Sequence, residues 1–109
     1  LSDVKVQLDN FFSPNKRQTL TYEIVINKVS QYFEISPEKI VSNARNRDIL
    51  IARNTAMYLC REYLDLPLKK IGMLFGGRDH ATVMHSIEKV SSDDSYNKHI
   101  EEIKKMLPL

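Results

Sequence analysis

The stretch LKKIGMLFGGRDHATVMHSIEKV, residues 68–90, constrains this chain more than any other. Apolar residues recur at the 3- and 4-residue steps of a helix over 68–75, and the same spacing returns over 83–90. The Gly76–Gly77 pair between them tolerates the positive φ that ends a helix. Asp79 follows, and its carboxylate can cap the next helix. Two helices joined by a glycine-bearing turn predict a helix-turn-helix.

The second of these helices is expected to begin with residues that are small or able to hydrogen-bond, namely Arg78, Asp79, His80, Ala81 and Thr82. In helix-turn-helix proteins that bind DNA, the N-terminal residues of the second helix meet base edges in the major groove. His80 follows the capping residue and is predicted to face bases. Its alternative role is that of a second capping group.

Positive charge gathers in the same part of the chain. Residues 39–87 carry eight Lys or Arg against four Asp or Glu, whereas residues 1–38 and residues 88–109 each have a net charge of −1. A local basic field suits a polyanion, because each neutralised phosphate releases condensed counterions. A solvated surface is the other reading of the asymmetry.

The remaining periodicity predicts an all-α fold of about six helices with a central helix-turn-helix. We expect one domain over 20–109, with 1–19 forming a connecting helix and hinge from a preceding domain or an ordinary first helix of the same domain. Thr21 and Ser36 are expected N-caps. Within the domain, helices are expected to start at these caps and to cover 49–66, 68–75, 79–90 and 96–107, with a loop at 91–95.

Residues 42–48, SNARNRD, hold two arginines without apolar periodicity and are predicted to form a loop. A short basic loop can enter the minor groove of A·T-rich DNA, which is narrow and strongly negative. The alternative to a minor-groove role is that both arginines of this loop are simply exposed to solvent. On the following helix, Arg53 is expected to pack its stem and project its charge outward.

The run IGMLFGGRDHATVMHSIEKV closely resembles the C-terminal DNA-binding domain of the bacterial replication initiator family DnaA. The elements IG, FGGRDH, TV, H and EKV stand in unbroken register. The resemblance extends upstream through 43–47 and 56–59, and it covers roughly 20–109. Ala81 departs from the pattern, which usually has a hydroxyl residue there. A methyl can contact a thymine methyl but cannot hydrogen-bond a phosphate.

The resemblance implies binding of double-stranded DNA at short A·T-rich boxes of the chromosomal origin. It implies a minor-groove role for Arg45. Base contacts in the major groove are expected from Leu68, Lys69, Asp79, His80, Ala81 and Thr82. Contacts to phosphates are expected from Arg47, Arg53, Asn54, Arg78 and Lys89. Other copies of the parent protein on the origin are expected partners, with acidic phospholipids as a further candidate.

Enzyme chemistry is not expected from these residues. There is no GxxxxGK[ST] loop, so ATP or ADP with Mg belongs to the longer parent protein that a start at Leu1 suggests. His80, His85 and His99 lack metal-ligand spacing, and His85 is expected to contact a neighbouring helix. The single cysteine, Cys60, falls on an apolar stripe and is read as inert.

A cytoplasmic protein is expected, because no apolar run approaches the ~18 residues of a membrane span. Two other functions fit the same pattern. One is a helix-turn-helix transcription regulator, and the other is a helical protein-interaction module without a DNA role.

Overall fold

The computed structural model describes residues 19–109, in which every regular element is helical and no strand occurs. This confirms the all-α prediction, while the expected helix and hinge of residues 1–18 lie outside the described residues. The elements are α1 (Tyr22–Phe33), α2 (Pro37–Ile40), α3 (Arg47–Leu64), α4 (Leu68–Leu74), α5 (His80–Ser92), the 3₁₀ turn η1 (Asp94–Tyr96) and α6 (Asn97–Lys104).

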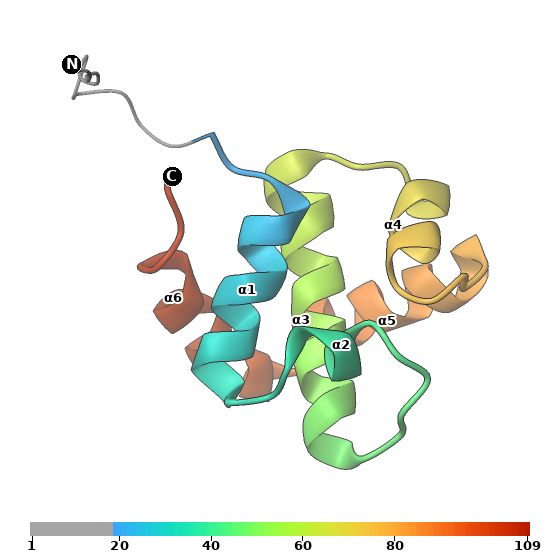
Figure 1. The fold of residues 1–109 in the computed structure, drawn as a ribbon, viewed down its shortest axis with the longest axis horizontal. Coiled ribbons are helices and arrows are strands. Elements are labelled where there is room, and N and C mark those ends of the chain that lie inside the picture. The colour runs from blue at the N-terminus through green and yellow to red at the C-terminus, as the bar shows by residue number, and fades with distance from the viewer. Residues whose placement is uncertain (1–18) are drawn as a thin grey trace, which may run out of the picture.

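Helix α3 forms the centre of the domain (Figure 1). It packs most extensively against α1 on one side and α5 on the other, and it also contacts α2, α4 and α6. The core lies where these helices meet, and every one of the six contributes a fully buried side chain: Val29, Ile40, Met57, Ile71, Val83 and Ile103. The helix-turn-helix therefore packs on a helix that contacts every other α-helix of the domain.

The expected caps set the helix starts. Thr21 Oγ1 accepts from the Ile24 backbone N–H at 3.2 Å, and Ser36 caps α2 in the same way with Pro37 at its first position. Helix α3 begins at Arg47, two residues before the predicted start at 49, and ends at Leu64 before the left-handed Asp65 (φ 53°). The predicted 42–48 loop is therefore shorter, because Arg47 and Asp48 belong to the helix.

The predicted loop at 91–95 is wrong in its first half. Helix α5 continues to Ser92, and the Ser91 and Ser92 hydroxyls donate to carbonyls one turn back, at 3.2 and 2.8 Å. Serine can occupy a helical position because its hydroxyl can donate a hydrogen bond to a backbone carbonyl of the preceding turn. Asp93 then ends α5 and caps η1, accepting from the Ser95 N–H at 3.0 Å.

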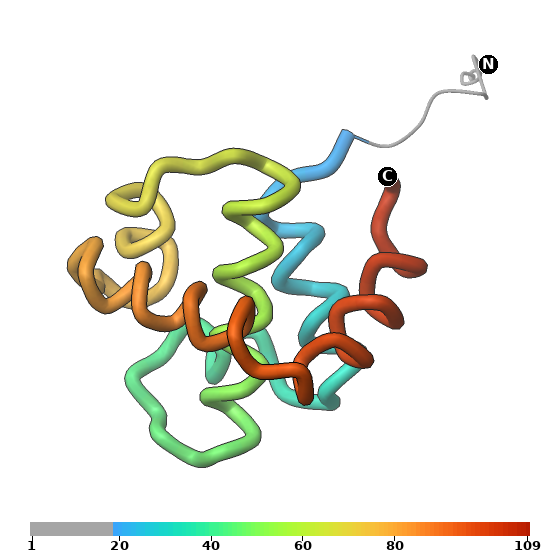
Figure 2. The backbone as a smooth tube through the Cα atoms, turned by 180° about the vertical axis from the view of Figure 1, so that it is seen from behind, coloured from blue at the N-terminus to red at the C-terminus, as the bar shows by residue number. Residues whose placement is uncertain are grey.

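Helix α6 closes the domain against α1, as the view from behind shows (Figure 2). The His99 Nδ1 and the Tyr32 hydroxyl are hydrogen-bonded at 3.0 Å, and the His99 ring also packs against Phe33. This contact fixes α6 on the side of α3 remote from α4. Among the described helices, none is long and apolar enough to cross a membrane.

Candidate nucleic-acid interface

The turn between α4 and α5 depends on three glycines. The backbone N–H groups of Gly77 and Arg78 both donate to the Gly72 carbonyl at 2.9 Å, which ends α4. Gly76 and Gly77 hold φ values of 89° and 76°, which glycine adopts without strain. A Cβ on Gly72 would lie 2.0 Å from the Arg78 carbonyl oxygen. The two helices can approach each other this closely only without a side chain at that position.

Phe75, the residue that follows α4, is fully buried, as are Ile71 and Val83. These side chains come from α4, the turn and α5, so the apolar contact that fixes the angle between the helices lies directly under the turn. The helix phase predicted for 68–90 is confirmed. The buried side chains of Ile71, Phe75 and Val83 thus hold the first turn of α5 in place, with its other face toward solvent.

Asp79 caps α5. Its Oδ1 accepts from the Thr82 backbone N–H at 2.9 Å. Hydrogen bonds from the backbone and side chain of Thr82 hold the pKa of the Asp79 carboxyl below its ordinary value, and the electrostatic effect of His80 acts in the same direction. The side chains of Asp79, His80, Ala81 and Thr82 are exposed. An ionised acceptor and three small or polar side chains thus stand at the exposed start of the helix.

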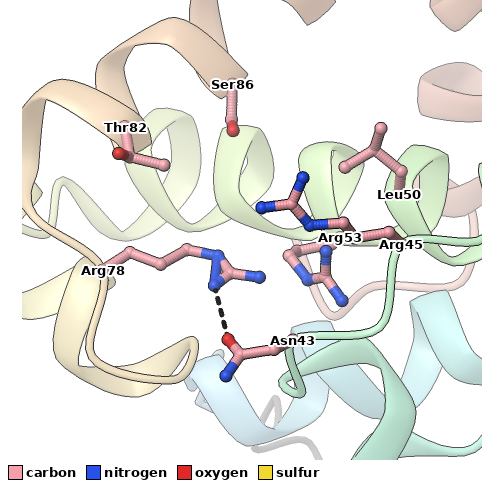
Figure 3. Close-up of a pocket in the computed structure, with 7 residues that line it drawn as sticks. All are labelled: Asn43, Arg45, Leu50, Arg53, Arg78, Thr82 and Ser86. Atoms are coloured by element: carbon pink, nitrogen blue, oxygen red, sulfur yellow. Dashed lines mark hydrogen bonds between the residues drawn. The ribbon is translucent and has the colours of Figure 1, made fainter.

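Two clefts flank this first turn. The loop cleft, about 590 Å³, lies between α5 and the loop of residues 41–46 and is lined by Asn43, Arg45, Leu50, Arg53, Arg78, Thr82 and Ser86 (Figure 3). Three of its seven lining residues are arginines and none is acidic. The α4 cleft, about 800 Å³, is lined by Arg61, Pro67, Leu68, Lys69, Met73, Gly77, Arg78, Asp79 and His80.

Residues of α5 divide between the two clefts. Thr82 and Ser86 face the loop cleft, whereas Asp79 and His80 face the α4 cleft beside Lys69 and Leu68. Ser86 was not predicted to contact DNA, although its position four residues after Thr82 puts it on the same helix face. Met73, 67% exposed, was also missed, because it lies off the apolar stripe of α4.

Arg53 does not project its charge outward as predicted. It is 2% exposed, its Nε donates to the Ile40 carbonyl at 2.8 Å, and its Nη2 donates to the Ala44 carbonyl at 2.8 Å. Burial, followed by the charge of Arg78, lowers the pKa of its guanidinium. The carbonyls at the end of α2 and in the 41–46 loop take up its donors, so it forms the floor of the loop cleft.

Asn54 is likewise inside the domain, where it is 6% exposed and donates from Nδ2 to the Tyr96 hydroxyl at 3.1 Å. This contact joins α3 to η1. This burial argues against the phosphate contact predicted for Asn54, which stays a prediction. To bind a phosphate, the Asn54 amide would have to lie on the solvent side of α3, whereas it faces η1.

Arg78, also predicted to bind phosphate, reaches back to the 41–46 loop. Its Nη1 donates to Asn43 Oδ1 at 3.2 Å and its Nη2 donates to the Ser42 carbonyl at 3.0 Å (Figure 3). Asn43 was not predicted as a functional residue. Its only signal in the sequence is its place in a polar loop, which does not reveal a partner 35 residues away.

The other predicted contacts lie on the surface. Arg45, Arg47 and Lys69 are exposed at the loop, the start of α3 and the start of α4, respectively. Lys89 is exposed late in α5, with its Nζ 3.8 Å from Asp93 Oδ2. His85 is exposed too, and its predicted contact with a neighbouring helix stays a prediction.

The described residues contain no candidate metal centre, and their one cysteine is inert. Residues 19–109 contain no group of three or more His, Cys, Asp or Glu that could hold a metal ion. Cys60 is fully buried in the core, and burial raises the pKa of its thiol to about 12. The thiol is therefore protonated at neutral pH and is a poor nucleophile.

Comparison with known proteins places this arrangement in a family. A family model described as "Bacterial dnaA protein helix-turn-helix" matches residues 22–90. The chain is 42% identical over 86 residues to the chromosomal replication initiator protein DnaA of Lachnoclostridium phytofermentans, which covers 79% of this chain and 19% of that protein. The protein of the same name from Synechocystis is 37% identical over 95 residues, or 84% of this chain and 21% of the relative.

A third relative, the chromosomal replication initiator protein DnaA of Cutibacterium acnes, is 40% identical over 90 residues, with 83% of this chain and 18% of the relative covered. The chain thus spans about a fifth of the length of the curated relatives it matches. The family model covers α3, the 41–46 loop, α4, the turn and all but the last two residues of α5. The chain belongs to the family of bacterial DnaA helix-turn-helix domains.

Proposed function

We propose that this domain binds double-stranded DNA sequence-specifically, at short A·T-rich boxes of a chromosomal replication origin, as the DNA-binding part of a longer initiator. The observation that carries the proposal is the capped, exposed first turn of α5 between two clefts with basic linings. A helix in the major groove has one sugar-phosphate backbone on each side. Two flanking clefts with arginine and lysine side chains provide a place for each.

The base contacts follow from position on α5. Asp79, His80, Ala81 and Thr82 reach base edges, and Leu68 and Lys69 approach the same groove from the start of α4. Asp79 accepts from the amino group of cytosine or adenine. Ala81 offers its methyl to a thymine methyl.

The 41–46 loop serves the adjacent minor groove. Arg45 is exposed there and is the residue we assign to that groove, whose negative potential in A·T-rich DNA attracts arginine. Arg47 and Lys89 are the exposed cations assigned to phosphates. Arg53 and Asn54 are not included, because both are buried.

For the parent protein, we propose that further copies occupy neighbouring boxes and that ATP or ADP with Mg binds outside this domain, in the cytoplasm. Acidic phospholipids remain a candidate partner of the basic surface. A helix-turn-helix transcription regulator is the second candidate function, because the same first turn of α5 would read a different site.

The test is fluorescence anisotropy with a panel of duplexes that contains A·T-rich origin boxes, regulator-type operators and scrambled sequences, at two salt concentrations. We expect the origin boxes to bind at least about 10³-fold more tightly than scrambled DNA, with affinity that falls steeply as salt rises. Preference for an operator would support the regulator. Binding that is absent, or equal on all duplexes, would contradict sequence-specific recognition.

A further inference from the structure

We infer that Arg78 is a positioning residue that clamps the 41–46 loop to the helix-turn-helix and so presents Arg45, rather than a contact to phosphate. The inference rests on the proposed function, since it concerns how one part of the DNA-binding surface is arranged. It gives the arginine of the FGGRDH run a role within the protein.

The main chain of Arg78 is fixed on the side of α4. Its N–H donates to the Gly72 carbonyl at 2.9 Å, and its own carbonyl lies so close to Gly72 that a Cβ there would be 2.0 Å away. The turn also touches the loop directly, because a Cβ on Gly76 would lie 2.9 Å from the Val41 carbonyl oxygen. Arg78 therefore extends its side chain from a fixed base toward a loop that already abuts the turn.

The side chain of Arg78 then grips two consecutive loop residues. One nitrogen of its planar fork donates to the Asn43 side-chain oxygen and the other to the Ser42 carbonyl, at 3.2 and 3.0 Å. A guanidinium suits such a pair of acceptors because its donors are held in a rigid plane. A lysine ammonium carries the same charge on a flexible stem and lacks that geometry.

Arg53 holds the same segment from α3. It donates to the carbonyls of Ile40 and Ala44, both at 2.8 Å, and more distantly to that of Lys39 at 3.4 Å. Loops without ladder partners must satisfy their backbone groups in another way, and here two guanidiniums do so. Arg45 follows Ala44 directly. Arg53 and Arg78 therefore both hold the residues just before Arg45, namely Ser42, Asn43 and Ala44.

The clamp has a consequence for binding. A loop that is already ordered loses less conformational freedom when it docks, so its contacts contribute more of their energy to affinity. Loosening the clamp should therefore remove the benefit of Arg45 without removing any positive charge. This separates positioning from a phosphate contact, where the charge itself matters.

The experiment compares Arg78→Lys with the wild-type domain on an origin box and on a scrambled duplex, by anisotropy across a salt series. Asn27→Ala is the matched control, because Asn27 is exposed on α1 and has no assigned contact with DNA or with the 41–46 loop. Asn43→Ala releases the clamp from the loop side and keeps every charge. Circular dichroism melts show that each variant is folded, and Asn43→Ala carries the test if Arg78→Lys is not.

We expect Arg78→Lys and Asn43→Ala each to weaken box binding roughly tenfold, with scrambled DNA and the salt slope unchanged and Asn27→Ala near wild type. In an Arg45→Ala background, the same substitutions should add almost nothing, because a double-mutant cycle reports residues that act through one another.

Three results would overturn the clamp: wild-type binding by the clamp variants, equal losses on both duplexes, or losses that add fully to that of Arg45→Ala. If the wild-type domain itself shows no preference for the box, the proposed function fails before any variant is compared.

Discussion

Asp79 combines two tasks at one position, since it caps α5 through the Thr82 N–H and lies at the exposed first turn, which we propose reads bases. The two tasks respond differently to substitution. Asparagine is as good an N-cap as aspartate, but it lacks the charge and adds an N–H donor.

Asp79→Asn should therefore keep the melting temperature close to that of the wild type while lowering the specificity ratio about tenfold. Asp79→Ala should lower both, because alanine cannot cap the helix. Thermal melts and paired titrations on box and scrambled DNA check this. An Asp79→Ala variant as stable as the wild type would contradict the capping role. An Asp79→Asn variant with unchanged specificity would contradict the base contact.

The lowered pKa of Asp79 also sets a direction for pH dependence. A carboxyl whose folded-state pKa lies below its unfolded-state pKa adds stability above the unfolded value, and this stability is lost as the pH falls through the folded value. The stability difference between wild type and Asp79→Ala should therefore be full at neutral pH and shrink in acid. Urea titrations at a series of pH values measure it, and a difference that grows in acid would show the opposite linkage.

Sequence reasoning located these surface residues better than the buried polar ones. The cap at Asp79 and the exposed His80 follow from local chemistry that a short stretch contains. Arg53 and Asn54 are buried because α3 contacts other elements on nearly every side, which no helical period reveals. Their partners, the carbonyls of Ile40 and Ala44 and the Tyr96 hydroxyl, are supplied only by the tertiary fold.

At the scale of elements, the helix-turn-helix is held by the apolar contact beneath its turn. Phe75 is among the largest fully buried side chains. Phe75→Ala should lower the free energy of unfolding by about 3–5 kcal/mol, because the cavity adds to the lost transfer energy. Urea denaturation followed by circular dichroism measures this loss, and a variant that unfolds at the wild-type midpoint would mean that the helices do not pack on this ring.

The turn allows a matched pair of glycine substitutions. Gly76 and Gly77 both have positive φ, but a Cβ on Gly77 meets nothing within 4 Å, whereas one on Gly76 meets the Val41 carbonyl at 2.9 Å. Gly77→Ala should cost about 1–2 kcal/mol of strain alone. Gly76→Ala should cost more, because the backbone of the loop must also move.

The difference between the two glycine variants in denaturant midpoint is the quantity to measure. Equal midpoints would show that the turn and the 41–46 loop are not in contact. The sequence identified both glycines as the end of a helix, but it did not show that only one of them abuts another segment. That distinction depends on which loop packs beside the turn.

At the scale of the whole molecule, α3 separates two functions of the fold. On one side, α1 and α6 complete the core through contacts such as that of Tyr32 with His99. On the other, α4 and α5 form the proposed reading surface (Figure 1). The apolar periodicity predicted this architecture, because long stripes of core residues dominate it. Helix ends differed by up to three residues, since α3 begins at Arg47, α5 continues to Ser92 and α6 already ends at Lys104.

The central claim is that the first turn of α5 reads sequence while the rest of the surface supplies attraction. His80 and Lys89 lie on the same exposed helix, at its first residue and in its last turn. His80→Ala should therefore lower the ratio of box to scrambled affinity, by about 1–3 kcal/mol per lost base contact. Lys89→Ala should weaken both duplexes alike and make the log–log salt slope shallower by roughly one unit.

The decisive measurement is a pair of salt titrations for each of these two variants, one on an origin box and one on scrambled DNA. A loss of specificity confined to His80→Ala, with a changed salt slope confined to Lys89→Ala, is the result expected from this geometry. If His80→Ala instead loses affinity equally on both duplexes, His80 does not contact bases and the helix-turn-helix docks on DNA in another way.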